Sequence, residues 1–435
     1  MKLAVIGTGY VGLVSGACFS EFGFDVTCID KDAGKVDSIR LGVMPIYEPG
    51  LAALVERNVK AGRLHFSTDL GPAVADSEAV FIAVGTPSRR GDGHADLSYV
   101  FEAAAEIAVN LSGYTVVIKK STVPVGTGRK VEEVVRKANP SADFDVASNP
   151  EFLREGAAIQ DFMRPDRVVV GTKTTRAKEV LKALYRPLYL IETPILITSL
   201  ETSELIKYAS NAFLAVKISY INQIADLCEK VGANVHEVSK GMGLDRRIGS
   251  KFLHPGPGYG GSCFPKDTIA LVQTADDYGV EIGIVSEIVA YNQARKKSMA
   301  KRVEIAAGSS VKGLEVAVLG LSFKPETDDM RDSPSLEIIP SLLAAGASVK
   351  AYDPQAMGEA KQFLPGSTIF AKNVEDCLAA ADVVVILTEW NEFRALEPKH
   401  FISAMNGRVI VDLRNIYDPV AMREAGLIYE SIGRD

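Results

Sequence analysis

The sequence predicts an α/β protein with two Rossmann-like, doubly wound parallel-sheet domains joined by a long central helix. Short β-rich runs alternate with helical patterns near both ends of the chain, which is typical of parallel sheets covered by helices. A glycine-rich turn follows the first strand, and no Gly or Pro interrupts the stretch from Glu201 to Val231. We expect domains at 1–198, 199–300 and 301–435, a division that 435 residues allow.

Charge and cysteine content narrow the class of protein. The net charge is −7 at pH 7 without a long basic run, so no nucleic-acid partner is expected. The five cysteines are scattered, and no pair has the spacing of a metal or redox site. An odd number of cysteines also argues against a disulfide framework, so we expect a cytoplasmic protein. Because no cysteine pair has metal-site spacing, we expect no bound metal.

The first residues have a second interpretation. The charged start and the apolar stretch as far as Cys18 are also compatible with a secretory signal. The glycine spacing inside this stretch and the acid that ends the next strand favour a folded strand and helix instead. No other apolar run approaches the roughly 20 residues of a membrane span, so no membrane partner is expected.

The N-terminus has the pattern of a dinucleotide-binding strand, turn and helix. A strand at Lys2–Ile6 leads into a Gly-x-Gly-x-x-Gly turn and a helix, and the next strand ends on Asp30. Gly7 makes the tight turn, Gly9 lets the backbone approach a pyrophosphate, and Gly12 lets the helix pack on the strand. Because a carboxylate at position 30 binds a ribose diol and repels a 2′-phosphate, the pattern favours NAD over NADP.

Further strands of the first sheet are expected at Ala79–Val84, Thr115–Lys119, Phe144–Ala147 and Arg167–Val170. Ligands of doubly wound sheets bind beyond the carboxyl ends of the strands. The segments at those ends are Gly85–Pro87, Lys120–Pro124 and Ser148–Glu151. Each segment is compatible with ordinary turn chemistry, but three at the same edge of one sheet favour a ligand-binding rim.

The central helix begins with a predicted capping box at Thr198–Glu201 and continues to Val231. At about 1.5 Å per residue it is long enough to join two domains, and it makes a homodimer our default expectation. Lys207 and Asn211 are four residues apart and therefore share one face of this helix. Apolar neighbours surround them, so a buried pair and a solvated surface lysine are both open interpretations.

The loop Gly256–Asp267 is rich in glycine and is followed by a helix expected at Thr268–Tyr278. Cys263 would lie one residue before the N-cap of that helix. Helix amides, the helix dipole and Lys266 would then favour its thiolate form. The alternative is a buried cysteine in a surface turn, but Pro265 and the glycines favour a reactive thiol.

A second α/β unit follows a helix at Glu281–Ala306 and repeats the order of the first unit between Leu314 and Asp412. This order indicates a weak internal duplication. The second copy lacks the dinucleotide turn but carries Lys324 and Arg331 after its first strand. Two cations at a strand-end crevice suit the phosphates of a nucleotide substrate, although a charged surface loop is also possible.

Seven segments together resemble the nucleotide-sugar 6-dehydrogenases of the UDP-glucose/GDP-mannose dehydrogenase family, over essentially the full length. They are Gly7–Gly12, Gly85–Pro87, Ser121–Pro124, Asn149–Gly156, Lys207 with Asn211, Gly258–Asp267 and Phe323–Pro334. The resemblance implies a four-electron oxidation of C6 of UDP-glucose to a carboxylate, with two NAD reduced in turn. The family's catalytic thiol matches Cys263. A thiolate would trap the aldehyde as a thiohemiacetal and then form a thioester.

The resemblance also implies the other catalytic roles. Lys207 and Asn211 match the pair that stabilises the oxyanion at C6, and Asp267 matches the carboxylate that orders a catalytic water. Whether Lys207 or that water takes the first proton stays open. The family's water-binding and thioester-hydrolysis residues match Thr122, Glu151 and Glu155.

Two sets of binding residues follow from the same resemblance. The NAD contacts would be Gly7, Gly9, Tyr10, Val11, Gly12, Asp30, Lys35, Thr86, Thr122, Glu155, Lys266 and Arg331. The sugar-nucleotide contacts would be Glu151, Phe152, Leu153, Lys207, Asn211, Phe252, Gly258, Phe323 and Lys324, with Arg247 reaching the substrate of a neighbouring subunit.

Three other functions remain as alternatives. The same chemistry could act on GDP-mannose or on a UDP-N-acetylaminosugar. A two-electron β-hydroxyacid dehydrogenase would share the Lys207–Asn211 spacing but needs neither a thiol nor a second nucleotide fold. A non-catalytic NAD-dependent sensor would have no reason to keep Cys263, Lys207 and the carboxylates together.

Overall fold

The computed structural model describes residues 1–87, 89 and 93–434. The chain forms two compact units. The first consists of Met1–Ser210 and Gln273–Gly279, and the second of Asn211–Val272 and Val280–Asp435. The expected three-part division of the chain stays a prediction. Among the described residues, no helix combines the length and the apolar character that crossing a bilayer requires.

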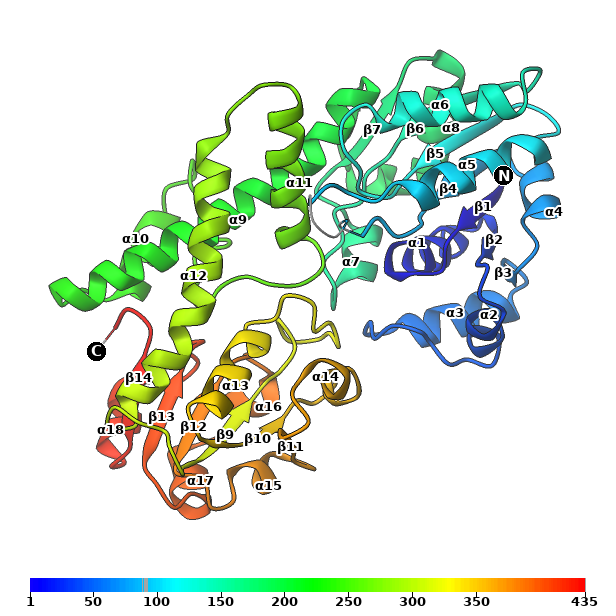
Figure 1. The fold of residues 1–435 in the computed structure, drawn as a ribbon. Helices are drawn as coiled ribbons and strands as arrows, with labels where there is room; N and C mark the ends of the chain where they lie inside the picture. The colour runs from blue at the N-terminus through cyan, green and yellow to red at the C-terminus, as the bar shows by residue number, and fades with distance from the viewer. Residues whose placement is uncertain (88, 90–92, 435) are drawn as a thin grey trace. The chain divides into compact units, whose positions relative to one another are not determined.

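The first unit contains an eight-stranded sheet in the order β3-β2-β1-β4-β5-β6-β7-β8 (Figure 1). Its strands are β1 (Lys2–Ile6), β2 (Asp25–Ile29), β3 (Leu64–Ser67), β4 (Ala79–Ile82), β5 (Thr115–Lys119), β6 (Phe144–Ser148), β7 (Val168–Thr172) and β8 (Ile195–Thr198). The first six are parallel, as the alternating pattern predicts, and they follow the order 3-2-1-4-5-6 of Rossmann sheets.

The sheet is parallel, as predicted, except at one pairing. β7 runs antiparallel to β6, with Ala147 opposite Thr172 and Ser148 opposite Gly171. After β6 the chain forms the rim loop and the short α7 (Ala158–Met163), which packs on α1 instead of crossing back along the sheet. A parallel pairing needs such a crossover. Because the residue pattern of a strand does not report its direction, the sequence could not reveal this reversal.

Helices cover both faces of the first sheet. They are α1 (Tyr10–Glu21), α2 (Ala33–Arg40), α3 (Leu51–Lys60), α4 (Leu70–Ala75), α5 (Ser98–Asn110), α6 (Thr127–Ala138), α8 (Thr175–Leu184) and the 3-10 helix η1 (Arg186–Ile191). Within β1, Leu3 and Val5 join one apolar core, while Ala4 and Ile6 join the other. This alternation is what a strand buried on both faces requires.

The long helix α9 (Leu200–Val231) contains 32 residues and connects the two units, as predicted (Figure 1). Its cap differs from the expectation. The hydroxyl of Ser199, not that of Thr198, accepts the backbone N–H of Thr202 at 3.1 Å. The other helices of this region are α10 (Val235–Gly243), α11 (Phe264–Asp277) and α12 (Gly283–Ala306).

The second unit contains a fully parallel six-stranded sheet in the order β11-β10-β9-β12-β13-β14. Its strands are β9 (Glu315–Leu319), β10 (Ser348–Tyr352), β11 (Ile369–Phe370), β12 (Val383–Ile386), β13 (Val409–Asp412) and β14 (Ile428–Ser431). Its helices are α13 (Ser335–Ala344), α14 (Met357–Phe363), α15 (Val374–Leu378), α16 (Asn391–Arg394), α17 (Pro398–Ala404) and α18 (Pro419–Glu424). This is again the order 3-2-1-4-5-6 within the unit.

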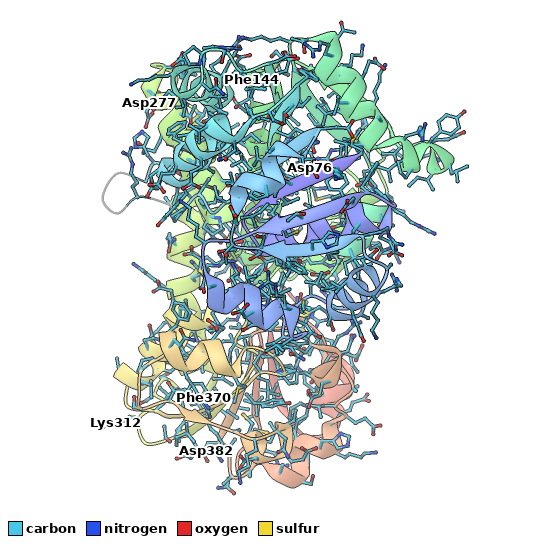
Figure 2. All side chains as sticks on the ribbon, turned by 90° about the vertical axis from the view of Figure 1, so that its right-hand side faces the viewer. Asp76, Phe144, Asp277, Lys312, Phe370 and Asp382 are labelled. Atoms are coloured by element: carbon cyan, nitrogen blue, oxygen red, sulfur yellow. The ribbon has the colours of Figure 1, made fainter. Side chains whose placement is uncertain are left out.

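Matching turns support the internal duplication. Gly7 and Gly320 follow the first strand of their sheets with φ values of 100° and 93°. Asp30 accepts the backbone N–H of Thr8, and Asp353 accepts that of Leu321. The carboxyl edge of each sheet is therefore built in the same way. Figure 2 labels Asp76 and Asp382, which precede β4 and β12 and mark the opposite, amino edges of the two sheets.

Candidate functional site

The glycine turn of the first unit is shaped for a closely approaching ligand. A Cβ on Gly7 would lie 2.8 Å from the carbonyl oxygen of Ala83, and one on Gly12 would lie 1.8 Å from that of Gly7. These two glycines therefore allow the tight turn and the helix packing that the motif predicts. A Cβ on Gly9 would meet nothing within 4 Å. The open space at the start of α1 fits a pyrophosphate.

Asp30 lies beside this turn as an ionised carboxylate. Its Oδ2 accepts the backbone N–H of Thr8 at 2.9 Å, the Thr8 hydroxyl at 2.7 Å and the Lys35 ammonium at 2.9 Å. Burial alone would raise the pKa of Asp30, but the hydrogen bonds from Thr8 and then Lys35 outweigh it and lower the pKa to about 2. Asp30 and Lys35 are thus brought together at the turn.

The three predicted rim segments meet at the carboxyl edge of the first sheet. The hydroxyl of Thr86 donates to the carbonyl oxygen of Thr122 at 2.9 Å. The hydroxyl of Ser121 donates to the carbonyl oxygen of Val84 at 2.7 Å. The chain therefore brings Thr86 and Thr122 into direct contact, although they are far apart in sequence.

Lys207 forms a buried ion pair with Glu151. Lys207 Nζ lies 3.0 Å from Glu151 Oε1, and the two side chains are only 4% and 5% exposed. The ring of Phe152 lies 5.4 Å from the same ammonium, and the backbone N–H of Leu153 donates to Glu151 Oε2. The interpretation of Lys207 as a solvated surface lysine is therefore wrong.

A third buried charge, Lys120, belongs to the same group. Its ammonium donates to Asn149 Oδ1 at 3.0 Å. Burial lowers the pKa of Lys120 to about 8, opposed by the charge of Glu151 and reinforced by that of Lys207. Lys120 belongs to the predicted rim, but its sequence context predicted no role for it. The only signal in the sequence is that Lys120 directly follows the strand Thr115–Lys119, which is apolar from Val116 to Ile118.

Tyr10 and Glu155 lie next to a buried acid that the sequence patterns did not reveal. The Tyr10 hydroxyl donates to Glu48, whose carboxylate also accepts the backbone N–H groups of Gly156 and Ala158 at 2.7 and 2.8 Å. Burial, then the hydrogen bond to Glu48, and then the charges of Glu48 and Glu155 raise the pKa of Tyr10. Glu48 thus holds the segment around Glu155 against the start of α1.

The thiol of the second unit lies at the start of a helix. α11 begins at Phe264, four residues before the expected start, and the backbone N–H of Asp267 donates to the Cys263 carbonyl at 2.8 Å. Cys263 therefore occupies the N-cap position itself, not the position before it. Its Sγ lies 3.5 Å from the Ser262 hydroxyl, and the side chain is half-buried.

The glycines of this loop bring its backbone against the rest of the second unit. A Cβ on Gly260 would lie 2.3 Å from the carbonyl oxygen of Asp332, and one on Gly261 would lie 2.7 Å from the ring of Phe323. Gly258, with φ 122°, leaves no room for a Cβ beside Asn292. These contacts explain the glycines by packing inside the protein.

Asn211 and Asp267 form a buried hydrogen bond, with 2.6 Å between Nδ2 and Oδ2. Lys266 Nζ lies 2.9 Å from the other oxygen of Asp267. Because Asp267 is one helical turn after Cys263, a thiol, a carboxylate and an amide lie in one small region of the second unit. Phe252, a predicted sugar-nucleotide contact, has its ring centroid 6.1 Å from that of Phe264.

Of the three remaining predicted cations of the second unit, Arg331 and Arg247 are held by acids. Arg331 forms two hydrogen bonds with Asp329, at 2.8 and 2.9 Å, and Asp329 also accepts the backbone N–H of Ser262. The Lys324 ammonium lies 5.3 Å from the centroid of the Phe323 ring. Arg247 is 89% exposed and is bonded to Asp245, so it lies at the surface of its own unit.

The predicted residues thus form two groups, one in each unit. The first unit holds Gly7, Gly9, Tyr10, Val11, Gly12, Asp30, Lys35, Thr86, Thr122, Glu151, Phe152, Leu153, Glu155 and Lys207. The second holds Asn211, Arg247, Phe252, Gly258, Cys263, Lys266, Asp267, Phe323, Lys324 and Arg331. Lys207 and Asn211 are four residues apart on α9, so this helix carries one member of each group on the same face.

Three family models match the chain in sequence. Residues 1–189 match the NAD binding domain of the UDP-glucose/GDP-mannose dehydrogenase family, 201–294 its central domain, and 317–419 its UDP binding domain. The chain belongs to the UDP-glucose/GDP-mannose dehydrogenase family. The cofactor is therefore NAD, which agrees with the open turn at Gly9 and with the ionised Asp30.

Curated members of the family match the chain over its full length. UDP-glucose 6-dehydrogenase of Rhizobium meliloti is 59% identical over 436 residues, covering 100% of both chains. UDP-glucose 6-dehydrogenase TuaD of Bacillus subtilis is 48% identical and covers 100% of this chain and 93% of its own length.

Two solved structures have the same fold. A UDP-glucose dehydrogenase from Pyrobaculum islandicum superposes with a TM-score of 0.92 at 38% identity, covering 100% of this chain and 98% of that one. A UDP-D-ManNAc dehydrogenase from Pyrococcus horikoshii has a TM-score of 0.85 at 27% identity, with coverage of 100% and 99%.

Proposed function

We propose that this enzyme oxidises C6 of UDP-glucose to the carboxylate of UDP-glucuronate. The observation that carries the proposal is the thiol of Cys263 at the N-cap of α11, one turn before the hydrogen-bonded Asp267–Asn211 pair. A two-electron dehydrogenase has no use for this thiol. The choice of sugar is supported by the full-length relatives, which are UDP-glucose 6-dehydrogenases at up to 59% identity.

The overall reaction converts one primary alcohol, one water and two NAD⁺ into one carboxylate, two NADH and three protons. NAD supplies the hydride acceptor for both oxidations when it is bound. The Cys263 thiolate adds to the aldehyde carbon and forms a C–S bond, so the aldehyde stays on the protein. Loss of a second hydride converts this thiohemiacetal to a thioester. Water then breaks the C–S bond and releases the thiol.

Lys207 and Asn211 are proposed to stabilise the negative oxygen that develops at C6. Lys207 is buried and paired with Glu151, so its charge is oriented and poorly screened by solvent. The proton of the alcohol goes to Lys207 or to a water ordered by Asp267. Thr122, Glu151 and Glu155 are proposed to serve water and the hydrolysis of the thioester.

The binding roles are proposed as follows. The turn at Gly7–Gly12 with Asp30 and Lys35 holds NAD, and Tyr10, Val11, Thr86, Thr122, Glu155, Lys266 and Arg331 contact it. Phe152, Leu153, Phe252, Gly258, Phe323 and Lys324 hold the sugar nucleotide. Arg247 reaches the substrate of a neighbouring subunit, which its 89% exposure and its place at the surface of its unit support.

We also propose a homodimer in the cytoplasm. Phe213, Tyr220 and Leu227 recur every seven residues along α9 and are 64%, 46% and 55% exposed. An apolar stripe with this spacing suits helix pairing with a second copy. All five cysteines are free, which suits a reducing compartment.

The test of the proposed substrate is a comparison of three sugar nucleotides with the purified enzyme and NAD. NADH release should be fastest, at limiting substrate concentration, with UDP-glucose. The alternatives are GDP-mannose and UDP-N-acetylmannosamine. The second is favoured by the 27%-identical UDP-D-ManNAc dehydrogenase, and a higher kcat/KM for either would replace the proposed substrate.

A further inference from the structure

The buried carboxylate of Glu204 accepts hydrogen bonds from three donors. Glu204 lies on α9, three residues before Lys207, and its side chain has no exposed surface. Oε1 accepts from Lys119 Nζ at 2.5 Å and from the backbone N–H of Gly128 at 2.8 Å. Oε2 accepts the backbone N–H of Gly126 at 2.7 Å. One carboxylate therefore accepts hydrogen bonds from β5 and from the start of α6.

These donors lie on both sides of the rim segment that carries Thr122. Lys119 is the last residue of β5, and Gly126 directly precedes the first residue of α6. Between them the chain is tied to its neighbour by the hydrogen bond from Thr86 to the Thr122 carbonyl. Glu204 thus fixes the two ends of a seven-residue loop, 120–126, to a single point on α9.

The same turn of α9 is fixed against the sheet. The Ser203 hydroxyl donates to the Ser148 carbonyl at 3.3 Å, at the carboxyl end of β6. A Cβ on Gly171 would lie 2.6 Å from Ser203 Cβ, and one on Gly128 would lie 3.2 Å from Glu204 Oε1. The first approach requires glycine, and at the second a Cβ would press against the Glu204 carboxylate. The distance between the loop of Thr122 and the turn of Lys207 is set by close packing around Glu204.

Stability alone does not account for this arrangement. A buried ion pair is seldom more stabilising than apolar side chains of the same volume. Gly126 precedes α6 with a left-handed backbone, φ 90°, and it has no side chain to cap the helix. Glu204 caps it from another helix, so the hydrogen bonds fix the position of the loop as well as the end of α6.

We propose that Glu204 is a positioning residue that holds the Thr122 loop in register with Lys207. The inference rests on the proposed function, in which Thr122 serves the hydrolysis of the Cys263 thioester. Loss of the carboxylate would let the loop move, and a displacement of about 1 Å can cost about 100-fold in rate. The step most affected is release of the acid product, because it depends on the water that Thr122 holds.

The test uses Glu204→Gln, the double variant Lys119→Met/Glu204→Leu and a matched control in the full-length enzyme. Glu204→Gln keeps the size of the side chain but removes its charge. The double variant removes both buried charges together, so neither is left without a partner. The control is Glu201→Gln, because Glu201 joins the same helices through a half-exposed ion pair with Arg129. We would measure the melting temperature, kcat and KM for UDP-glucose, and the intact mass of the enzyme during turnover.

Folded Glu204 variants should lose about 100-fold in kcat with KM close to that of the wild type. They should also accumulate a sugar-nucleotide adduct on Cys263 during turnover, while Glu201→Gln behaves as the wild type. If Glu204→Gln does not fold, the double variant alone tests the inference. Wild-type kcat in a folded variant, or an equal loss in Glu201→Gln, would overturn the inference. A wild-type enzyme that releases no NADH from UDP-glucose would instead overturn the proposed function.

Discussion

The ammonium of Lys207 lies 3.0 Å from the carboxylate of Glu151, and neither side chain is more than 5% exposed. The pair joins the long helix to the rim loop at the carboxyl edge of the first sheet. A lysine held in this way cannot spread its charge into solvent. Its positive charge is therefore poorly screened and can stabilise a negatively charged oxygen that approaches it.

Replacing Lys207 with Met should lower kcat by a factor of about 100 to 1,000, as expected when one oxyanion donor is removed. NAD affinity should change little, because the NAD turn lies at the start of α1. Glu151 loses its partner, so the melting temperature should also fall. Steady-state kinetics, NAD titration and thermal unfolding check the three effects. A loss confined to NAD binding would remove Lys207 from the chemistry.

Replacing Cys263 with Ser should stop the reaction after the first oxidation. The hydroxyl is a much weaker nucleophile than the thiolate, so an aldehyde-level species should be found on the enzyme or in solution. Mass spectrometry of quenched reactions detects it. Cys228→Ser is the control, because Cys228 is buried on α9 outside the thiol loop. Full turnover by the Cys263→Ser enzyme would sink the proposed role of the thiol.

Replacing Asp30 with Ala should weaken NAD binding and relax the discrimination against NADP. A hydrogen bond to a charged group contributes about 1.5–3 kcal/mol, so a loss of about tenfold to 100-fold in NAD affinity is expected. The variant also frees Lys35, whose ammonium is then available to a 2′-phosphate. The Kd values of both cofactors give the answer, and an unchanged ratio would contradict the ribose assignment.

The free energy of unfolding should reveal the low pKa of Lys120. This pKa is about 8 in the folded chain against 10.5 for an ordinary lysine, so the unfolded chain binds more protons between these values. Stability contributed by this site therefore rises with pH across that window. Denaturant titrations give the free energies of unfolding of the wild type and of Lys120→Met, and the difference between them should change between pH 8 and 10. The exposed Lys137→Met is the control, and its difference should stay constant.

Local patterns were sufficient to predict much of this fold. The turn at Gly7, the acid at position 30 and the uninterrupted helix to Val231 each depend on neighbours in sequence, and all three were predicted. The reversed direction of β7 was missed, because strand residues do not encode polarity. The start of α11 was placed too late, at Thr268, although Pro265 is typical of a first helical turn; the helix begins at Phe264.

The residues of the candidate site also divide into those that local sequence patterns predict and those that they do not. Lys207 and Asn211 were found from their helical spacing, and Cys263 from its glycine-rich context. Glu48, Lys120 and Glu204 were not found, because each is a charged residue whose burial depends on segments far away in sequence. A pattern in one sequence cannot show which charges are buried and paired. Such residues are identified only when their partners are known.

The most direct test of the central claim is the amount of NADH released when UDP-glucose is limiting and NAD is in excess. Two NADH per UDP-glucose are predicted, with UDP-glucuronate as the product, because the Cys263 thiol holds the aldehyde between the two oxidations. One NADH per UDP-glucose, with an aldehyde released, would contradict the four-electron reaction and leave the thiol without a catalytic role.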